Sequence, residues 1–105
     1  MTDFPPLSLA FPAREDWIFS RVLAERARTH GDRPFIQPLD GPALTYAEAD
    51  RLTNQIAHGL RALGVAHGDR VLLMLPNTVE FMLLWWAANR IGAIEVSVNT
   101  AYKGY

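Results

Sequence analysis

The stretch Gly64–Ala101, GVAHGDRVLLMLPNTVEFMLLWWAANRIGAIEVSVNTA, has the pattern of a strand, a helix and a second strand. Its segment Arg70–Leu75 is a short apolar run between a Gly-Asp turn and a Pro, which is typical of a buried strand. A helix of about four turns is expected over Thr78–Ile91. The β-branched segment Ile94–Val98 predicts the second strand. Two strands joined by a helix of this length predict a parallel βαβ unit with a right-handed crossover.

Both ends of this helix carry sequence signals. Asn77 is the expected N-cap, because its side-chain oxygen can accept a backbone N–H of the first turn. Glu80, three residues later, has the position of a capping-box acid and favours the positive end of the helix. Gly92 is expected to close the helix in a left-handed conformation.

The sequence before this unit predicts an amphipathic helix and a small hairpin. The helix is expected to begin at Asp16 or Trp17 and to stop at Thr29–Gly31. A strand at Phe35–Gln37, turn residues at Asp40–Pro42 and a return over the next three residues predict the hairpin. The helix has an apolar stripe and an opposing polar face, formed by Phe19, Val22, Leu23 and Ala27 and by Arg14, Arg21, Glu25 and Arg28, respectively.

A second amphipathic helix follows, with the clearest periodicity in the chain. Thr45 and Glu48 have the spacing of a capping box at its start, and Gly64 is expected to end it. Gly59, inside the helix, predicts close packing against a neighbour. The predicted buried stripe is Ala49, Leu52, Ile56, Leu60 and Leu63, and the predicted solvent face is Asp50, Arg51, Asn54, Gln55, His58 and Arg61.

The helix of the βαβ unit is apolar on all sides over Phe81–Ala88, and such a helix is normally covered all round. Two short helices and a few strands cannot easily cover it. We therefore expect an α/β fold that is an incomplete piece of a larger domain: a parallel βαβ unit, two amphipathic helices and a small hairpin. The expected division is a Pro-rich, extended lead-in over 1–13 and a partial domain over 14–105. By itself such a chain should expose an apolar patch along this helix and self-associate.

Composition excludes several classes of protein. With 105 residues the chain forms one small domain at most. Its net charge of −1 gives no electrostatic reason to expect nucleic acid as a partner. It has no Cys, which excludes disulfides and Cys-based zinc sites. The longest apolar run is too short for a membrane span and the N-terminus is a poor signal peptide, so a cytoplasmic location is expected.

Candidate chemistry is sparse. The three His residues, His30, His58 and His67, are too far apart for a local metal pair and are expected at the surface or at helix ends. Neither a nucleophile elbow nor either of the two common Gly-rich phosphate loops is present. No catalytic, cofactor-binding or metal-binding residue is therefore assigned.

Three segments remain as weaker candidates for a ligand site. Gly68–Arg70 is either an anion or nucleotide contact or, more simply, a turn with a charged pair at the start of a strand. Trp85 and Trp86 form either an aromatic platform or part of the core. Asn99–Lys103 follows the carboxyl end of a predicted parallel strand, where open α/β sheets bind ligands, although most such loops only connect elements.

The order of these pieces resembles the opening segment of the AMP-forming adenylating enzymes, the acyl-CoA synthetase and ligase superfamily. The resemblance covers nearly all of the chain from Trp17 onward, and its ending is most similar to ligases of the carnitine/crotonobetaine-CoA type. Ser97 departs from the Pro that commonly precedes V-N in that family. The matching landmarks are G-D-R-P at 31–34, L-T-Y-x-E at 44–48, A-x-x-L-x-x-L-G-V at 57–65, G-D-R-V at 68–71, P-N-x-x-E-F at 76–81, G-A-I at 92–94 and V-N-T-A-Y at 98–102.

This resemblance implies an enzyme that joins a carboxylate to ATP, giving an acyl-adenylate and pyrophosphate, and then passes the acyl group to coenzyme A. It makes 14–105 part of the N-terminal subdomain, with ATP, Mg and CoA bound by later segments and with the remainder of the enzyme as the natural partner. In the family the phosphate loop, the ribose-binding motif and the catalytic Lys all lie downstream, so Lys103 does not correspond to the catalytic Lys. The chain is then expected to be inactive alone. Two alternatives are a non-catalytic protein that docks on a separately encoded remainder and, less well supported, a self-contained flavodoxin-like binding module.

Overall fold

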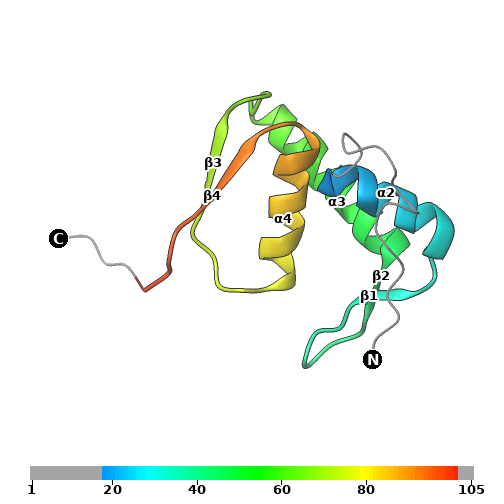
Figure 1. The fold of residues 1–105 in the computed structure, drawn as a ribbon. Helices are drawn as coiled ribbons and strands as arrows, with labels where there is room; N and C mark the ends of the chain where they lie inside the picture. The colour runs from blue at the N-terminus through cyan, green and yellow to red at the C-terminus, as the bar shows by residue number, and fades with distance from the viewer. Residues whose placement is uncertain (1–17, 102–105) are drawn as a thin grey trace, which may run out of the picture.

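The computed structural model describes residues 18–101, which form three helices and two pairs of strands (Figure 1). The lead-in over 1–13, Asp16 and Trp17, and Tyr102 and Lys103 lie outside the described residues. The order of elements is α2 (Phe19–His30), β1 (Pro34–Ile36), β2 (Leu44–Thr45), α3 (Tyr46–Ala62), β3 (Arg70–Leu73), α4 (Val79–Arg90) and β4 (Ile94–Ser97).

The strands β3 and β4 pair in parallel and α4 connects them, so the predicted βαβ unit is confirmed. Arg70 lies opposite Ile94, and Leu73 lies opposite Ser97. Both strands end earlier than predicted, because the last hydrogen bond between them runs from Val98 N to Leu73 O at 2.8 Å. Beyond this hydrogen bond the segments that follow β3 and β4 are no longer paired, and Pro76 restricts the backbone after β3. In Figure 1 α4 lies between this strand pair and the other two helices.

The predicted hairpin is also confirmed, as an antiparallel pair of β1 and β2. Pro34 lies opposite Thr45, and Ile36 lies opposite Leu44, with an irregularity between them. The hairpin is joined to α2 and α3 through the backbone, since Tyr46 N donates to Arg33 O at 3.1 Å.

The helix α2 begins at Phe19, later than predicted, because Ile18 has extended dihedral angles. Leu23 is its buried residue, as the stripe predicts. Phe19, however, is 47% exposed. On the outer face, Arg28 donates two hydrogen bonds to the Glu25 carboxylate, and this contact lowers the pKa of Glu25.

The helix α3 begins at the predicted cap. Glu48 N donates to Thr45 Oγ1 at 3.1 Å, and the Thr45 hydroxyl in turn donates to the Glu48 carboxylate at 3.1 Å. The helix ends in a Schellman arrangement: Gly64 has a φ of 96°, and Val65 N donates to Leu60 O at 3.1 Å.

Two predictions for α3 are wrong. Leu63 is 83% exposed, because it is the last residue before the chain turns away at Gly64. A Cβ on Gly59 would meet nothing within 4 Å, so this glycine does not mark close packing among the described residues. The fully buried position on α3 that the pattern missed is Thr53, at 0% exposure.

The helix α4 begins one residue later than the predicted cap. Thr78, not Asn77, accepts the hydrogen bond from the first turn, with Phe81 N donating to Thr78 Oγ1 at 3.3 Å. Glu80 lies in the first turn, where it faces the positive helix end as expected. Gly92 closes the helix with a φ of 76°, which confirms that prediction.

The core lies where α2, α3 and α4 meet. Its centre is Trp86, 2% exposed, with Phe19 and Phe35 stacked on it at ring-centroid distances of 5.3 and 5.2 Å. Small buried residues let the helices approach closely, namely Ala49 on α3 and Ala87 and Ala88 on α4. The exposed apolar patch on α4 is smaller than expected, because Trp85 is 40% exposed whereas the other residues of 81–88 are buried or half-buried. Self-association through this helix stays a prediction.

Large apolar side chains are also exposed on the strand pair. Leu72 and Ile94 are 66% and 51% exposed, on the two adjacent strands. Among the described residues α4 contacts this strand pair, and it lies between the pair and the other two helices (Figure 1). We refer to Leu72 and Ile94 as the bare sheet face.

A polar cluster joins the three helices at the end of α4. Arg90 donates to Asp50 Oδ1 at 2.7 Å and to Asn54 Oδ1 at 2.8 Å, both on α3. Ser20 N at the start of α2 donates to Asn89 Oδ1 at 3.2 Å. The prediction that Asp50 faces solvent is wrong, because its side chain is only 25% exposed and binds the cation of a neighbouring helix. Asn54 is exposed as predicted, and its side chain also accepts from Arg90.

Candidate binding site

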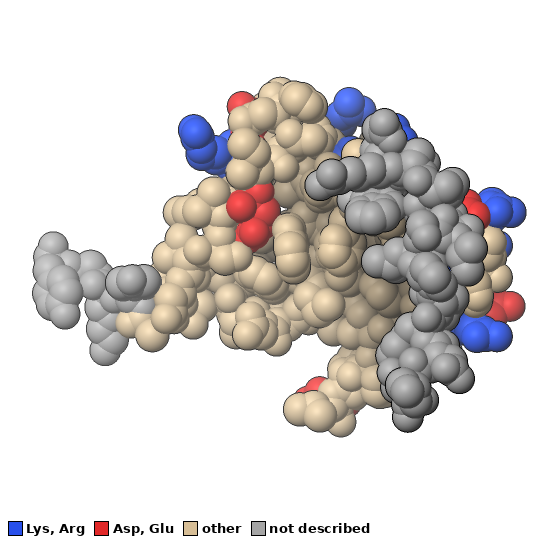
Figure 2. All heavy atoms as spheres, viewed as in Figure 1, with Lys and Arg blue, Asp and Glu red and all other residues tan. Residues whose placement is uncertain are grey.

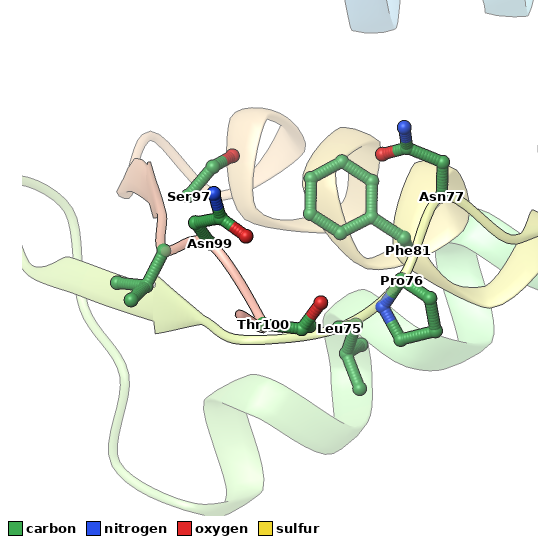
Figure 3. Close-up of a pocket in the computed structure, with 8 residues that line it drawn as sticks. Leu75, Pro76, Asn77, Phe81, Ser97, Asn99 and Thr100 are labelled. Carbon is green, nitrogen blue, oxygen red and sulfur yellow. The ribbon is translucent and has the colours of Figure 1, made fainter. Parts of the chain in front are cut away.

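A hollow of about 550 Å³ lies at the carboxyl ends of β3 and β4 (Figure 3). This end of a parallel strand pair is where open α/β sheets bind ligands. Its described lining residues come from the segment after β3, from the first turn of α4 and from the segment after β4: Leu75, Pro76, Asn77, Phe81, Ser97, Val98, Asn99 and Thr100.

Local backbone contacts fix the two segments that form the walls. After β3 the chain turns tightly into α4, with Thr78 N donating to Pro76 O at 2.8 Å. This turn places Asn77 beside the first turn of the helix, from which Phe81 projects. After β4, Asn99 Oδ1 accepts a hydrogen bond from Ala101 N at 2.9 Å, so the Asn99 side chain stabilises its own loop.

The polar groups of the hollow are neutral. Asn77 and Thr100 have no hydrogen-bond partner within residues 18–101, so their side chains remain available to a ligand. The Ser97 hydroxyl donates to the Glu95 carboxylate. Figure 3 shows Asn77, Ser97 and Asn99 around the Phe81 ring. Amides and hydroxyls beside an aromatic ring suit an uncharged group with its own donors and acceptors.

The hollow does not fit a nucleotide with its metal. Its described lining residues include no Lys, Arg or His that could bind phosphate. Glu80, in the first turn of α4, adds a negative charge close by. Over residues 18–101 there is no group of three His, Cys, Asp or Glu side chains that could hold a metal ion. No step through ATP and Mg can be assigned to these residues.

The structure places the other sequence candidates apart from this hollow. His30 lies at the end of α2, His58 is on the exposed face of α3, and His67 lies in the loop before β3. Asp69 accepts a hydrogen bond from Ala66 N at 2.8 Å, which agrees with the simple turn interpretation of Gly68–Arg70.

For the two tryptophans, the sequence left open an aromatic platform for a ligand or a place in the core. Trp86 belongs to the core, whereas Trp85 is partly exposed. Of the segment 99–103, Asn99 and Thr100 line the hollow, and its ligand-binding role stays a prediction. No helix of the described part of the chain has the length and apolar character needed to cross a membrane.

Sequence reasoning missed Asn77 and Phe81 as lining residues, since it treated Asn77 as a cap and Phe81 as core. The available signal was positional. Asn77 and Asn99 both follow the carboxyl end of a predicted parallel strand, and such ends meet at one edge of the sheet.

A βαβ unit with a neutral hollow at its carboxyl edge, preceded by two packed helices and a hairpin, is a segment of a larger α/β domain. A family model described as AMP-binding enzyme matches residues 23–105. The chain belongs to this family.

Two relatives named as CoA ligases also match this chain. "Long-chain-fatty-acid--CoA ligase FadD13" of Mycobacterium tuberculosis is 44% identical over 66 residues, which are 63% of this chain and 13% of the relative. "4-coumarate--CoA ligase 5" of Oryza sativa subsp. japonica is 36% identical over 84 residues, which are 80% of this chain and 15% of the relative. The chain therefore spans about one seventh of the length of these two ligases.

Solved structures confirm the fold. A Mycobacterium tuberculosis fatty acyl CoA synthetase superimposes with a TM-score of 0.68 at 42% identity, over 79% of this chain and 17% of that one. A "putative long-chain-fatty-acid CoA ligase" from Rhodopseudomonas palustris superimposes with a TM-score of 0.77 at 31% identity. The match covers 87% of this chain and 23% of that one. The predicted α/β piece thus corresponds to about a fifth of a larger AMP-binding structure.

Proposed function

We propose that these residues form the N-terminal scaffold segment of an ATP-dependent, AMP-forming acyl-CoA ligase. The observation that carries this proposal is the family match over 23–105 together with the superposition on a fatty acyl CoA synthetase at 42% identity. In the complete enzyme a carboxylate reacts with ATP to give an acyl-adenylate and pyrophosphate, and coenzyme A then displaces AMP. The residues that bind ATP, Mg and CoA belong to the rest of that enzyme.

The bare sheet face supports a scaffold role. A two-stranded sheet is only marginally stable alone, and β3 and β4 each have one edge without a partner strand among the described residues. Leu72 and Ile94 on this sheet are apolar and more than half exposed. Further strands and a covering helix from the rest of a ligase would pair the free strand edges and bury the exposed apolar side chains.

The names of the relatives also suggest which acyl substrates to test in the complete ligase. The relatives include ligases named for long-chain fatty acids and for 4-coumarate. The ending of the chain resembles the carnitine/crotonobetaine type. A substrate panel should therefore contain a long-chain fatty acid, 4-coumarate and carnitine with crotonobetaine.

The test is ATP–pyrophosphate exchange with this panel. The 105 residues alone should show no exchange above the background without protein. Robust exchange by this chain would overturn the scaffold proposal, since it would place the chemistry within these residues.

A second candidate is a non-catalytic protein that docks on a separately produced remainder of such a ligase, and the bare sheet face favours it. The remainder to use is the Mycobacterium tuberculosis FadD13 chain without its matched segment. Adding the 105-residue chain should restore exchange, and the L72K/I94K variant should not. Failure of both co-purification and rescue would rule docking out and leave the scaffold proposal standing.

A further inference from the structure

A second hollow of about 350 Å³ lies between α2, the hairpin, α3 and α4, away from the bare sheet face. Its lining is mostly apolar and aromatic, and its principal residues are Phe19, Val22, Phe35, Tyr46, Met82 and Trp86. We refer to this hollow as the aromatic groove.

The rings of the groove form a continuous row. Phe19 stacks on Trp86 at 5.3 Å, Trp86 on Phe35 at 5.2 Å, and Phe35 on Tyr46 at 4.5 Å between ring centroids. The row crosses four elements that are far apart in sequence, so only the tertiary structure creates it. A groove of parallel aromatic rings is the surface on which extended, Pro-rich segments dock.

Two observations indicate that this groove is built for an occupant. Phe19 is 47% exposed although it belongs to the aromatic row. Trp86 is 2% exposed, and its Nε1–H has no hydrogen-bond acceptor in the described part of the chain. A buried indole N–H normally finds an acceptor, and in Pro-rich ligands the backbone carbonyls are free to accept.

We propose that the Pro-rich segment Phe4–Pro12, FPPLSLAFP, of the chain's own lead-in occupies the aromatic groove. The segment carries no charge and has three Pro and four large apolar residues, Phe4, Leu7, Leu9 and Phe11. Proline restricts the unbound segment, so docking costs less conformational entropy.

The connection between segment and groove has the right length. The lead-in joins the described structure next to Phe19, which itself lines the groove. The seven steps from Pro12 to Phe19 reach about 22 Å in extended backbone, enough for the segment to turn back along the groove. The tether also gives an effective concentration of about 1 mM or more, so weak contacts suffice.

Disulfide trapping tests the proposal in the full chain, which contains no Cys of its own. The variant F11C/M82C joins the segment to α4, and L7C/M82C samples a second register. The control F11C/L63C places the second thiol at the far end of α3, at a residue that is 83% exposed. That position lies about 25 Å along the helix from Tyr46.

The expected result is an intramolecular disulfide in at least one Met82 variant, formed about tenfold faster than in the Leu63 control. Equal rates would show a segment without a preferred site and would overturn the proposal. Disulfide-linked dimers alone would also overturn it, since the occupant would then be the lead-in of a second copy.

A second measurement does not depend on register. In an M82C variant, thiol reactivity should rise about tenfold when Phe4, Leu7, Leu9 and Phe11 are all replaced by Ser, because the groove then stays open. An unchanged far-UV circular dichroism spectrum controls for folding. An unchanged reaction rate would overturn the proposal even if the disulfides form.

Discussion

Arg90 of α4 and Asp50 of α3 form an ion pair with an Nη2–Oδ1 distance of 2.7 Å, and their side chains are only 16% and 25% exposed. The same guanidinium donates to Asn54 at 2.8 Å and reaches Ser20 O at 3.5 Å. One cation thus connects all three helices. It also lies in the last turn of α4, where positive charge is favourable.

Replacing Asp50 with Ala should lower the free energy of unfolding by about 2 kcal/mol, because Arg90 would be left half-buried without its carboxylate. Urea unfolding followed by circular dichroism measures this loss. The matched control is Glu25→Ala, which breaks the exposed pair with Arg28 and should leave the free energy of unfolding almost unchanged. Equal losses in the two variants would contradict a special role for Arg90.

Thr53→Val should raise the free energy of unfolding by about 1 kcal/mol. Thr53 is completely buried, and its hydroxyl finds no hydrogen-bond partner among residues 18–101. Val has nearly the same shape and removes the unpaired group. The control Thr45→Val removes a hydroxyl that caps α3 and should cost about 1 kcal/mol. A loss of stability in the Thr53 variant would show that its hydroxyl is paired in solution.

Gly92→Ala should destabilise the chain by more than Gly64→Ala does. Both glycines have positive φ, 76° and 96°, so each Ala introduces backbone strain of about 1 kcal/mol. At Gly92 the new Cβ would also overlap the His67 ring, whereas at Gly64 it meets nothing within 4 Å among the described residues.

Thermal unfolding of the two variants, each with and without His67→Ala, separates the two effects. His67→Ala should recover part of the loss in Gly92→Ala and none in Gly64→Ala. If the recovery is the same at both sites, the packing of His67 on Gly92 has no energetic consequence.

The bare sheet face should make the 105-residue chain self-associate, and L72K/I94K should keep it monomeric. Burying two large side chains stabilises a contact by about 2–3 kcal/mol each at most, and two opposed Lys residues per copy would repel. Sedimentation velocity over a range of concentrations measures the change. Leu63→Lys is the control, since Leu63 is equally apolar and 83% exposed but lies away from the sheet. Monomeric behaviour of the unchanged chain would contradict this prediction.

Local signals in the sequence predicted much of the fold. The Thr45–Glu48 cap, the helix end at Gly64, the left-handed Gly92 and the parallel pair of strands around α4 all appear in the structure. Each depends on residues close in sequence, or on the rule that a short crossover helix joins parallel strands. Element ends were less accurate: Asn77 and Thr78 are both good caps, and the turn at Pro76 selects Thr78.

The candidate site was only half predictable. The position after a predicted strand indicated Asn99 and Thr100. Phe81 and Asn77 became lining residues only because α4 packs against the strand pair that it connects. The aromatic groove had no local signal at all, since Phe19, Phe35, Tyr46 and Trp86 lie on separate elements.

The sequence by itself determined the order of helices and strands, the cap of α3 and the family, because these depend on short-range periodicity, backbone preference and ordered motifs. Only the tertiary structure decided which surfaces are buried. Small side chains at Ala49, Ala87 and Ala88 bring α3 and α4 together and cover a helix that looked too apolar for this chain. The sequence pattern assigned Asp50 to the solvent face, whereas in the structure it forms an ion pair with Arg90. Burial and charge pairing depend on neighbours that are distant in sequence.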